Sequence, residues 1–191
     1  MSPAVKDCLT NDARKGEWID VFLLLDVGVC PIGCNSDQES LLYIAVRGNF
    51  IDSARKLLQT YAVPADSLSP TGEPLVTLAA EQRHWVLVLL LCGNGASCNG
   101  HTSENESLIA IAVRANHQDV VMDLLKRGVS ANSLSFGETL IALTVYQGQW
   151  HVAGMLLEGG ASALYRTDDN EGLLDIAFRQ YDKTQSNEEV V

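Results

Sequence analysis

The sequence contains few prolines, few aromatic residues and no long apolar stretch. Five prolines and fifteen glycines in 191 residues argue against a collagen-like or linker-rich protein. The longest apolar run covers only residues 85–92, whereas a membrane-spanning helix needs about 20 residues. The N-terminal residues show no apolar segment behind a basic start, so we expect neither a secretory signal nor a membrane span.

Basic residues are also scarce. Thirteen Lys and Arg face 24 Asp and Glu, which gives a formal net charge of -11. Such a charge repels phosphate backbones and anionic membrane surfaces, so we expect no nucleic-acid partner and no direct membrane insertion. Hydrophobic residues make up 47% of the chain and charged residues 19%, which indicates a single folded domain and not a disordered chain.

Cysteine and histidine are too scattered to predict a disulfide framework or a metal site. The chain has five cysteines and four histidines. An odd number of cysteines without framework spacing is typical of reduced thiols, so we expect a cytoplasmic or nuclear protein. We predict no cofactor and no metal ion.

One apolar pattern recurs along the chain, with the form Ser-Leu-Leu-Tyr-Ile-Ala where it first occurs. Its copies begin at residues 40, 74, 107, 139 and 172, so consecutive starts lie 34, 33, 32 and 33 residues apart. An amphipathic run with paired leucines follows the first four copies. A glycine such as Gly128 then suits the left-handed turn that ends a helix; in the second unit Tyr61 takes this place. Each unit therefore predicts a short helix, a turn, a longer helix and a polar loop.

At this point the sequence resembles the ankyrin repeat. Residues 125–132, Leu-Lys-Arg-Gly-Val-Ser-Ala-Asn, match the family's second signature, and Asn116-His117 lies where the family has Gly-His. The resemblance implies an all-α solenoid of stacked helix-turn-helix units with finger-like loops, forming a single ankyrin-repeat domain over residues 1–191. The expected units are about 3–35, 36–69, 70–102, 103–135 and 136–167, then a partial capping unit 168–183 and a polar tail 184–191.

The sequence offers little support for catalysis. It contains neither a Gly-rich phosphate loop with Lys-Ser/Thr nor a G-x-S-x-G turn. Asp168 and Asp169 are typical of a solvated turn, and Cys98 and His101 lack a third group to orient them. We therefore predict that the protein is not an enzyme.

Three kinds of residue are candidates for partner binding. A glutamate precedes the first helix of each unit after the first, where it either stabilises the helix dipole or forms one wall of a groove. Arginines recur near the ends of first helices, a position that the resemblance places on the concave face, as a second wall of opposite sign. Apolar side chains occupy the loop tips, and tryptophans at the turns serve packing or binding. The candidate partner-binding residues are Arg47, Glu73, Glu81, Glu106, Arg114, Leu134, Phe136, Glu138, Tyr146 and Trp150.

The resemblance implies a protein–protein interaction module, such as an adaptor, scaffold or targeting domain. It would bind a protein or peptide segment on its concave face and finger loops, and we expect a monomer. The alternative is a stand-alone stoichiometric inhibitor that masks a kinase or a basic segment of a transcription factor, which the length and acidity also fit. Asn99 and Asn132 lie where asparaginyl hydroxylase modifies many ankyrin proteins, so both are candidate modification sites.

Overall fold

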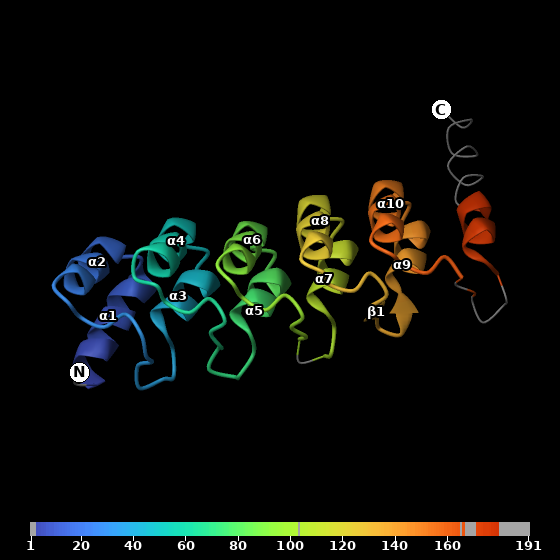
Figure 1. Ribbon diagram of the computed structural model, residues 1–191. Helices are drawn as coiled ribbons and strands as arrows, with labels where there is room; N and C mark the ends of the chain where they lie inside the picture. The colour runs from blue at the N-terminus through green and yellow to red at the C-terminus, as the bar shows by residue number, and fades with distance from the viewer. Residues whose placement is uncertain (1–2, 103, 165, 167–170, 180–191) are drawn as a thin grey trace, which may run out of the picture. The chain divides into compact units, whose positions relative to one another are not determined.

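A computed structural model shows a mostly helical chain (Figure 1), as the sequence predicted. The structure describes residues 3–102, 104–164, 166 and 171–179. The polar tail expected at 184–191 and the neighbouring residues 168–170 and 180–183 lie outside the described residues. By its internal contacts the chain divides into two compact units, Met1–Ser103 and Glu104–Val191.

Helix pairs follow one another in the first unit. The members of each pair pack on one another, α3 also packs on α1 and α5, and α4 contacts α6. First helices therefore form one row and the second helices of the later pairs another. The pairs are α1 (Pro3–Lys15) with α2 (Trp18–Asp26), α3 (Leu41–Arg47) with α4 (Ile51–Gln59), and α5 (Leu75–Glu81) with α6 (Trp85–Gly93).

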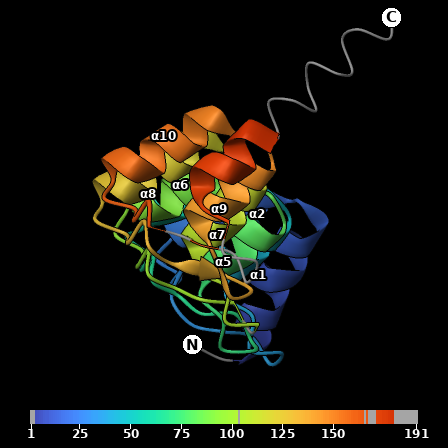
Figure 2. The same ribbon diagram turned by 90° about the vertical axis from the view of Figure 1, so that its right-hand side faces the viewer.

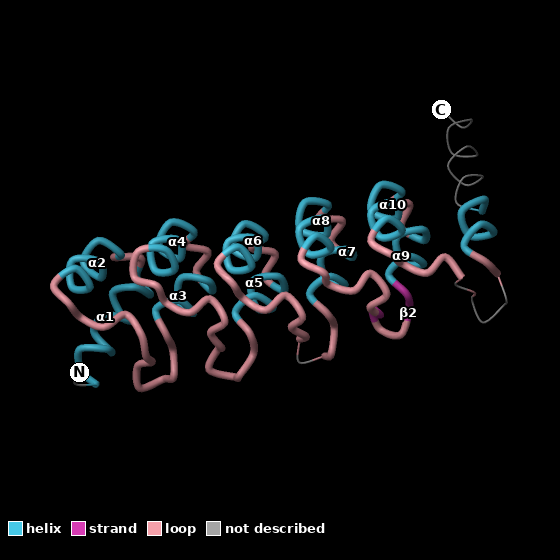
Figure 3. The backbone as a smooth tube through the Cα atoms, in the orientation of Figure 1, coloured by secondary structure: helices cyan, strands magenta, loops and turns pink. Residues whose placement is uncertain are grey.

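The second unit repeats this arrangement. Figure 2 shows α8 beside α10 in one layer and α7 beside α9 in the other, in agreement with the contacts between them. A short antiparallel hairpin precedes α9 (Figure 3), and residues 173–179 are also helical. The elements are α7 (Leu108–Arg114), α8 (Gln118–Lys126), β1 (Leu134–Ser135), β2 (Glu138–Thr139), α9 (Leu140–Tyr146) and α10 (Trp150–Glu158).

Local chemistry sets where the helices begin and end. Ser40 and Ser107 cap α3 and α7, because each hydroxyl oxygen accepts a hydrogen bond from a backbone N–H one turn later. After α8, Gly128 adopts the left-handed conformation with a φ of +82°. Its N–H donates to Leu125 and the next N–H donates to Leu124, so carbonyls at the helix end are satisfied.

The apolar core lies between the two rows of helices in each unit. In α4, α6, α8 and α10 the third, fourth and seventh residues are all buried. These positions lie on one helix face, which therefore packs on the neighbouring first helices. The residues are Ser53, Ala54, Leu57, Leu87, Val88, Leu91, Val120, Val121, Leu124, Val152, Ala153 and Leu156.

None of the helices in the described part of the chain combines the length and apolar character needed to cross a membrane.

Tyr61 stands where the other repeats have a glycine, and its side chain connects the end of α4 to α2. Its ring stacks on Phe22 with centroids 6.0 Å apart, and its hydroxyl donates a hydrogen bond to Asp26. The left-handed turn falls one residue later, on Ala62, with a φ of +50°. Burial, and then the hydrogen bond to Asp26, raise the pKa of Tyr61 to about 12.

This pKa predicts a loss of stability at high pH. A tyrosine whose pKa is raised in the folded state stabilises the protein below its unfolded pKa of about 10, and this contribution is lost as the pH rises through about 12. We expect the free energy of unfolding to fall more steeply between pH 10 and 12 in the wild type than in Tyr61→Phe. Urea denaturation at several pH values measures both slopes, and equal slopes would contradict the assignment.

Candidate functional site

A buried glutamate in the second unit is held by groups from two directions. The Glu106 side chain is only 4% exposed and lies just before α7. Arg114, at the end of α7, donates from Nη2 to Oε2 of Glu106 at 2.7 Å. The Ser135 hydroxyl in β1 donates to Oε1 at 2.9 Å. A buried carboxylate requires such partners, so Glu106 ties the hairpin to α7 and orients Arg114.

Arg114 also contacts the exposed tip of the hairpin. Its guanidinium carbon lies 5.1 Å from the centre of the Phe136 ring, within the range of a cation–π contact. The Arg114 side chain is 43% exposed and Phe136 is 66% exposed. Leu134, in the same hairpin, is 53% exposed. The structure thus brings together four predicted residues, Glu106, Arg114, Leu134 and Phe136, as one surface that we call the hairpin site.

The backbone at Phe136 is unusual for its residue type. Leu134 pairs with Thr139 and Ser135 with Glu138, so Phe136 and Gly137 form a two-residue turn. Both have positive φ, +48° for Phe136 and +89° for Gly137. Turns of this kind prefer Asn-Gly or Asp-Gly, because a left-handed conformation is costly for other residues. A strain of about 1–3 kcal/mol is typical of such an outlier.

The length of the loop explains this strain. At the corresponding loops, Cys34 bridges to Ser40, Leu68 to Pro74 and Arg166 to Gly172, each across six positions. In the hairpin the bridge from Leu134 to Thr139 spans only five. The same missing residue shortens the sequence period to 32 between residues 107 and 139. The shorter loop closes as a two-residue turn, which places Phe136 in the left-handed region.

The arginines and glutamates of the first unit also pair with each other. Arg14 forms hydrogen bonds to both Asp37 and Glu39, and these bonds raise the pKa of its guanidinium above the usual value. The Arg47 side chain is 62% exposed, and its Nη1 lies 3.6 Å from Oε1 of Glu39. Glu106–Arg114 and Glu171–Arg179 form the equivalent pairs in the second unit. Arg47, Arg114 and Arg179 thus each reach the glutamate eight residues before them, whereas Arg14 reaches Glu39 of the next repeat. At these repeats the acidic and basic side chains pair with one another and do not form the two separate walls that we predicted.

Two of the repeats lack the arginine of this pattern. Eight residues after Glu73 stands Glu81, which is exposed at the end of α5, and Oε1 of Glu73 is buried with no hydrogen-bond partner among the described residues. Eight residues after Glu138 stands Tyr146, half-buried at the end of α9, while Glu138 itself is exposed. Arg47, Glu73 and Glu81 belong to the first unit, and no observation joins them to the hairpin site.

The two asparagines proposed for modification are exposed. Asn132 uses both ends of its side-chain amide: Nδ2 donates to the Gly160 carbonyl at 3.0 Å, and Oδ1 accepts from the Ser162 N–H at 2.8 Å. It therefore links two consecutive loops of the second unit. Asn99 lies in a second turn of the loop after α6, at residues 98–99. Hydroxylation stays a prediction at both positions.

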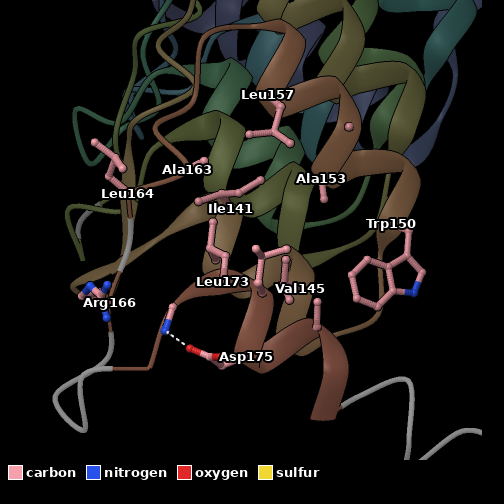
Figure 4. A pocket seen from close by; sticks show the side chains of 14 residues that line it. Ile141, Val145, Trp150, Ala153, Leu157, Ala163, Leu164, Arg166, Leu173 and Asp175 are labelled. Atoms are coloured by element: carbon pink, nitrogen blue, oxygen red, sulfur yellow. Dashed lines mark hydrogen bonds between the residues drawn. The ribbon is translucent and has the colours of Figure 1, made fainter.

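A separate apolar pocket lies beside α10 (Figure 4). Its volume is about 770 Å³, and its walls come from α9, α10, the loop after α10 and helical residues 173–179. Trp150, a predicted partner-binding residue at the turn before α10, is 51% exposed and lines this pocket. By contrast, Trp18 is buried and packs against Phe22 and Phe50, so packing accounts for it.

Sequence reasoning missed the apolar side chains around this pocket. Leu157, Leu164, Leu174 and Phe178 are 46%, 93%, 74% and 67% exposed. A signal was available, because residues 173–179 carry the apolar pattern of a first helix while the residues after them are polar. Within the described residues no group of three or more His, Cys, Asp or Glu side chains could hold a metal ion.

The comparisons with known proteins are distant. No protein-family model matches the chain. Among curated proteins, the transient receptor potential cation channel subfamily A member 1 homolog of Caenorhabditis elegans is 22% identical over 165 residues. The alignment covers 86% of this chain and 14% of that protein, so the chain spans about a seventh of the relative's length.

Among solved structures, the chain resembles one in the complex of the Bd0816 predatory endopeptidase from Bdellovibrio bacteriovorus with immunity protein Bd3460. The TM-score is 0.67 at 19% sequence identity, and the match covers 92% of each chain. At this identity the likeness concerns the fold alone.

The strain at Phe136 predicts that its replacement is tolerated. Phe136→Asn relieves about 1–3 kcal/mol of backbone strain and removes a cation–π contact worth about 0.5–1 kcal/mol. We expect the free energy of unfolding, measured with urea, to stay unchanged or rise by about 1 kcal/mol. Ser135→Ala, which leaves Glu106 with one partner fewer, should lower it by about 1 kcal/mol. A clear loss of stability in Phe136→Asn would mean that Phe136 serves the fold.

Proposed function

We propose that the protein is a non-catalytic protein-interaction module built of ankyrin repeats, which binds a protein segment at the hairpin site. One observation carries the proposal: Phe136 is held exposed, on a strained backbone, by a turn that another residue would fit better. Strain and exposure at one aromatic side chain give no benefit to folding. A residue of this kind is retained more readily for contact with a partner.

The surroundings of Phe136 suit an anchor residue. The hairpin is rigid because β1 and β2 pair and because Ser135 is fastened to buried Glu106. Arg114 is oriented by the same carboxylate and lies over the ring. Aromatic residues and arginine dominate binding energy at many protein interfaces. Groups already held in position lose little freedom on binding, so more of the contact energy appears as affinity.

The chemistry of the hairpin site indicates the kind of segment that fits it. Leu134 and Phe136 offer apolar surface on either side of Ser135, while Arg114 keeps exposed N–H donors beside the ring. A segment with an apolar side chain next to a carboxylate or backbone carbonyl would satisfy both. The neighbouring exposed Glu138 disfavours a second acidic group on that side.

The distant likenesses agree with this proposal. The repeated helix pairs and left-handed helix ends are what the ankyrin resemblance leads one to expect. The similar solved fold comes from a structure that contains a protein–protein complex. A stack in which each pair contacts mainly its neighbours presents loops that can vary without disturbing the core, and this suits recognition better than catalysis.

The proposal predicts a selective loss of partners. In a quantitative pull-down from lysate, the double variant Leu134→Ser with Phe136→Asn should recover at least tenfold less of one or more proteins that the wild type binds. Leu68→Ser, which changes an equally exposed loop leucine of the first unit, is the matched control and should retain them. Circular dichroism establishes that all variants fold alike. Equal recovery with the double variant would remove the hairpin site from consideration.

The net charge of -11 favours a second candidate, an inhibitor that masks a basic segment. The two functions differ in their response to salt. Anchoring through Leu134 and Phe136 should change affinity less than threefold between 50 and 300 mM NaCl, because apolar contacts are little screened. The affinity of a masking inhibitor for its partner should fall tenfold or more over the same range of salt, since the attraction is electrostatic. Titration of the captured partner at both salt concentrations distinguishes the two.

A further inference from the structure

Two cysteine side chains meet where α6 ends. The thiol of Cys98, in the loop after the helix, donates a hydrogen bond to Sγ of Cys92, and the two sulfur atoms lie 2.9 Å apart. A covalent S–S bond is about 2.05 Å long, so a movement of less than about 1 Å brings these sulfurs into bonding distance. An interval of six residues predicts no disulfide by itself, so the pairing of these two thiols emerges from the fold.

The turn after α6 brings the two thiols together. Gly95 adopts the left-handed conformation with a φ of +95°, and its N–H donates to the Cys92 carbonyl at 3.2 Å. The N–H of Ala96 then donates to the Leu91 carbonyl at 3.0 Å, which directs the chain back past the last helical turn. Two residues later the Cys98 thiol lies 3.6 Å from the Ala96 carbonyl as well as beside Cys92. The bonds that end the helix therefore also position Cys98.

The loop that carries Cys98 is fastened to its surroundings on both sides of this residue. Before it, the N–H of Ser97 donates to Oδ1 of Asp66 at 3.2 Å, which links the loop to the preceding loop of the first unit. After it, Gly100 lies so close to Thr77 that a Cβ on the glycine would stand 3.0 Å from the Thr77 methyl carbon. The position of the Cys98 thiol is therefore set by backbone contacts and not by its side-chain rotamer alone.

The two thiols differ in their access to solvent. Cys92 is only 2% exposed, on the buried side of α6, whereas Cys98 is half-buried in the loop. A small oxidant in solution can therefore reach the sulfur of Cys98 but not that of Cys92. An accessible cysteine next to a sheltered second thiol is the arrangement found at redox-sensitive sites, where the second thiol resolves the first product.

We propose that Cys92 and Cys98 form a reversible disulfide when the protein meets glutathione disulfide. The thiolate of Cys98 attacks one sulfur of the oxidant, whose S–S bond breaks and releases one glutathione thiolate. The thiolate of Cys92 then attacks the Cys98 sulfur of the mixed disulfide, forms the Cys92–Cys98 bond and releases the second glutathione. The two protons of the cysteine thiols pass to the two glutathione thiolates, so the cysteines lose two electrons and the oxidant gains two.

The bond closes a ring of residues 92–98 and holds the loop after α6 against the helix end. Because the cross-link restricts the unfolded chain and fits the native arrangement, oxidation stabilises the fold. It also restricts the backbone beside exposed Asn99, the candidate modification site that follows Cys98 directly. This redox site lies in the first unit and the hairpin site in the second, so the inference does not depend on the proposed function.

The test uses the full chain with the exposed Cys8, Cys30 and Cys34 replaced by serine, which leaves only the pair. The chain is equilibrated with graded ratios of reduced to oxidised glutathione, and its intact mass is measured after an acid quench. We expect the loss of two hydrogen atoms without a glutathione adduct. The equilibrium constant for this step should be at least tenfold larger in the folded chain than in the same chain unfolded in urea, because only the fold holds the thiols together. Equal constants, a stable glutathione adduct or a disulfide-linked dimer would overturn the proposal.

Two single variants on the same background test the order of the steps. Cys92→Ser should accumulate one glutathione on Cys98, because no second thiol resolves the mixed disulfide. Cys98→Ser should acquire glutathione at least tenfold more slowly, because Cys92 is buried. Equal rates in the two variants would contradict the assigned roles.

The wild type provides a readout that does not depend on the serine replacements. After oxidation and alkylation, proteolytic digestion should yield a peptide in which Cys92 and Cys98 are linked. Oxidation should raise Tm by several degrees, and dithiothreitol should reverse the rise. Recovery of both cysteines as alkylated thiols at a glutathione ratio that modifies the exposed Cys8 would contradict the proposal.

Discussion

Within each of the two compact units, the main stabilising contact is the burial of one face of the second helices α4, α6, α8 and α10 against the first helices. The face is narrow, with three positions in a nine-residue helix, and it repeats from α4 to α10 with little variation. Such short helices are not stable alone, so each depends on its neighbours for its apolar contacts. The loops add only a few buried apolar side chains, such as Val129 and Ala131. The exposed residues of the loops can therefore change without loss of the core.

The hairpin before α9 shows how far such a change can go. Removal of one residue converts the wider loop of the other repeats into a two-residue turn, and the turn forces a phenylalanine into a left-handed conformation. The strain is offset in part because Ser135, beside the turn, donates to the buried carboxylate of Glu106, and because Arg114, held by the same carboxylate, lies against the Phe136 ring. A charged group inside the repeat thus supports an exposed group at its tip.

Much of the fold followed from the spacing of leucines and glycines, because these residues obey local rules. The helix pairs, the left-handed glycine at 128 and the exposed tips at Leu134 and Phe136 were all predicted. The pairing of Arg114 with Glu106 was not, although the interval of eight residues recurs with Arg47 and Arg179; it depends on how the chain turns before α7. The pocket at Trp150 was missed because it arises from a face that is uncovered, and a sequence shows apolar residues without showing what covers them.

Asn132 illustrates why one residue type is required at a point that contributes nothing to the core. Its amide is both donor and acceptor, to Gly160 and from Ser162. In the first unit Asp66 serves as acceptor alone, for the N–H of Ser97, and there a carboxylate is sufficient. Deamidation of Asn132 would keep the acceptor but turn the donor into a second oxygen facing a carbonyl oxygen. The hydrogen-bonded link between these two loops is therefore sensitive to deamidation of a single side chain, whereas the equivalent link at Asp66 is not.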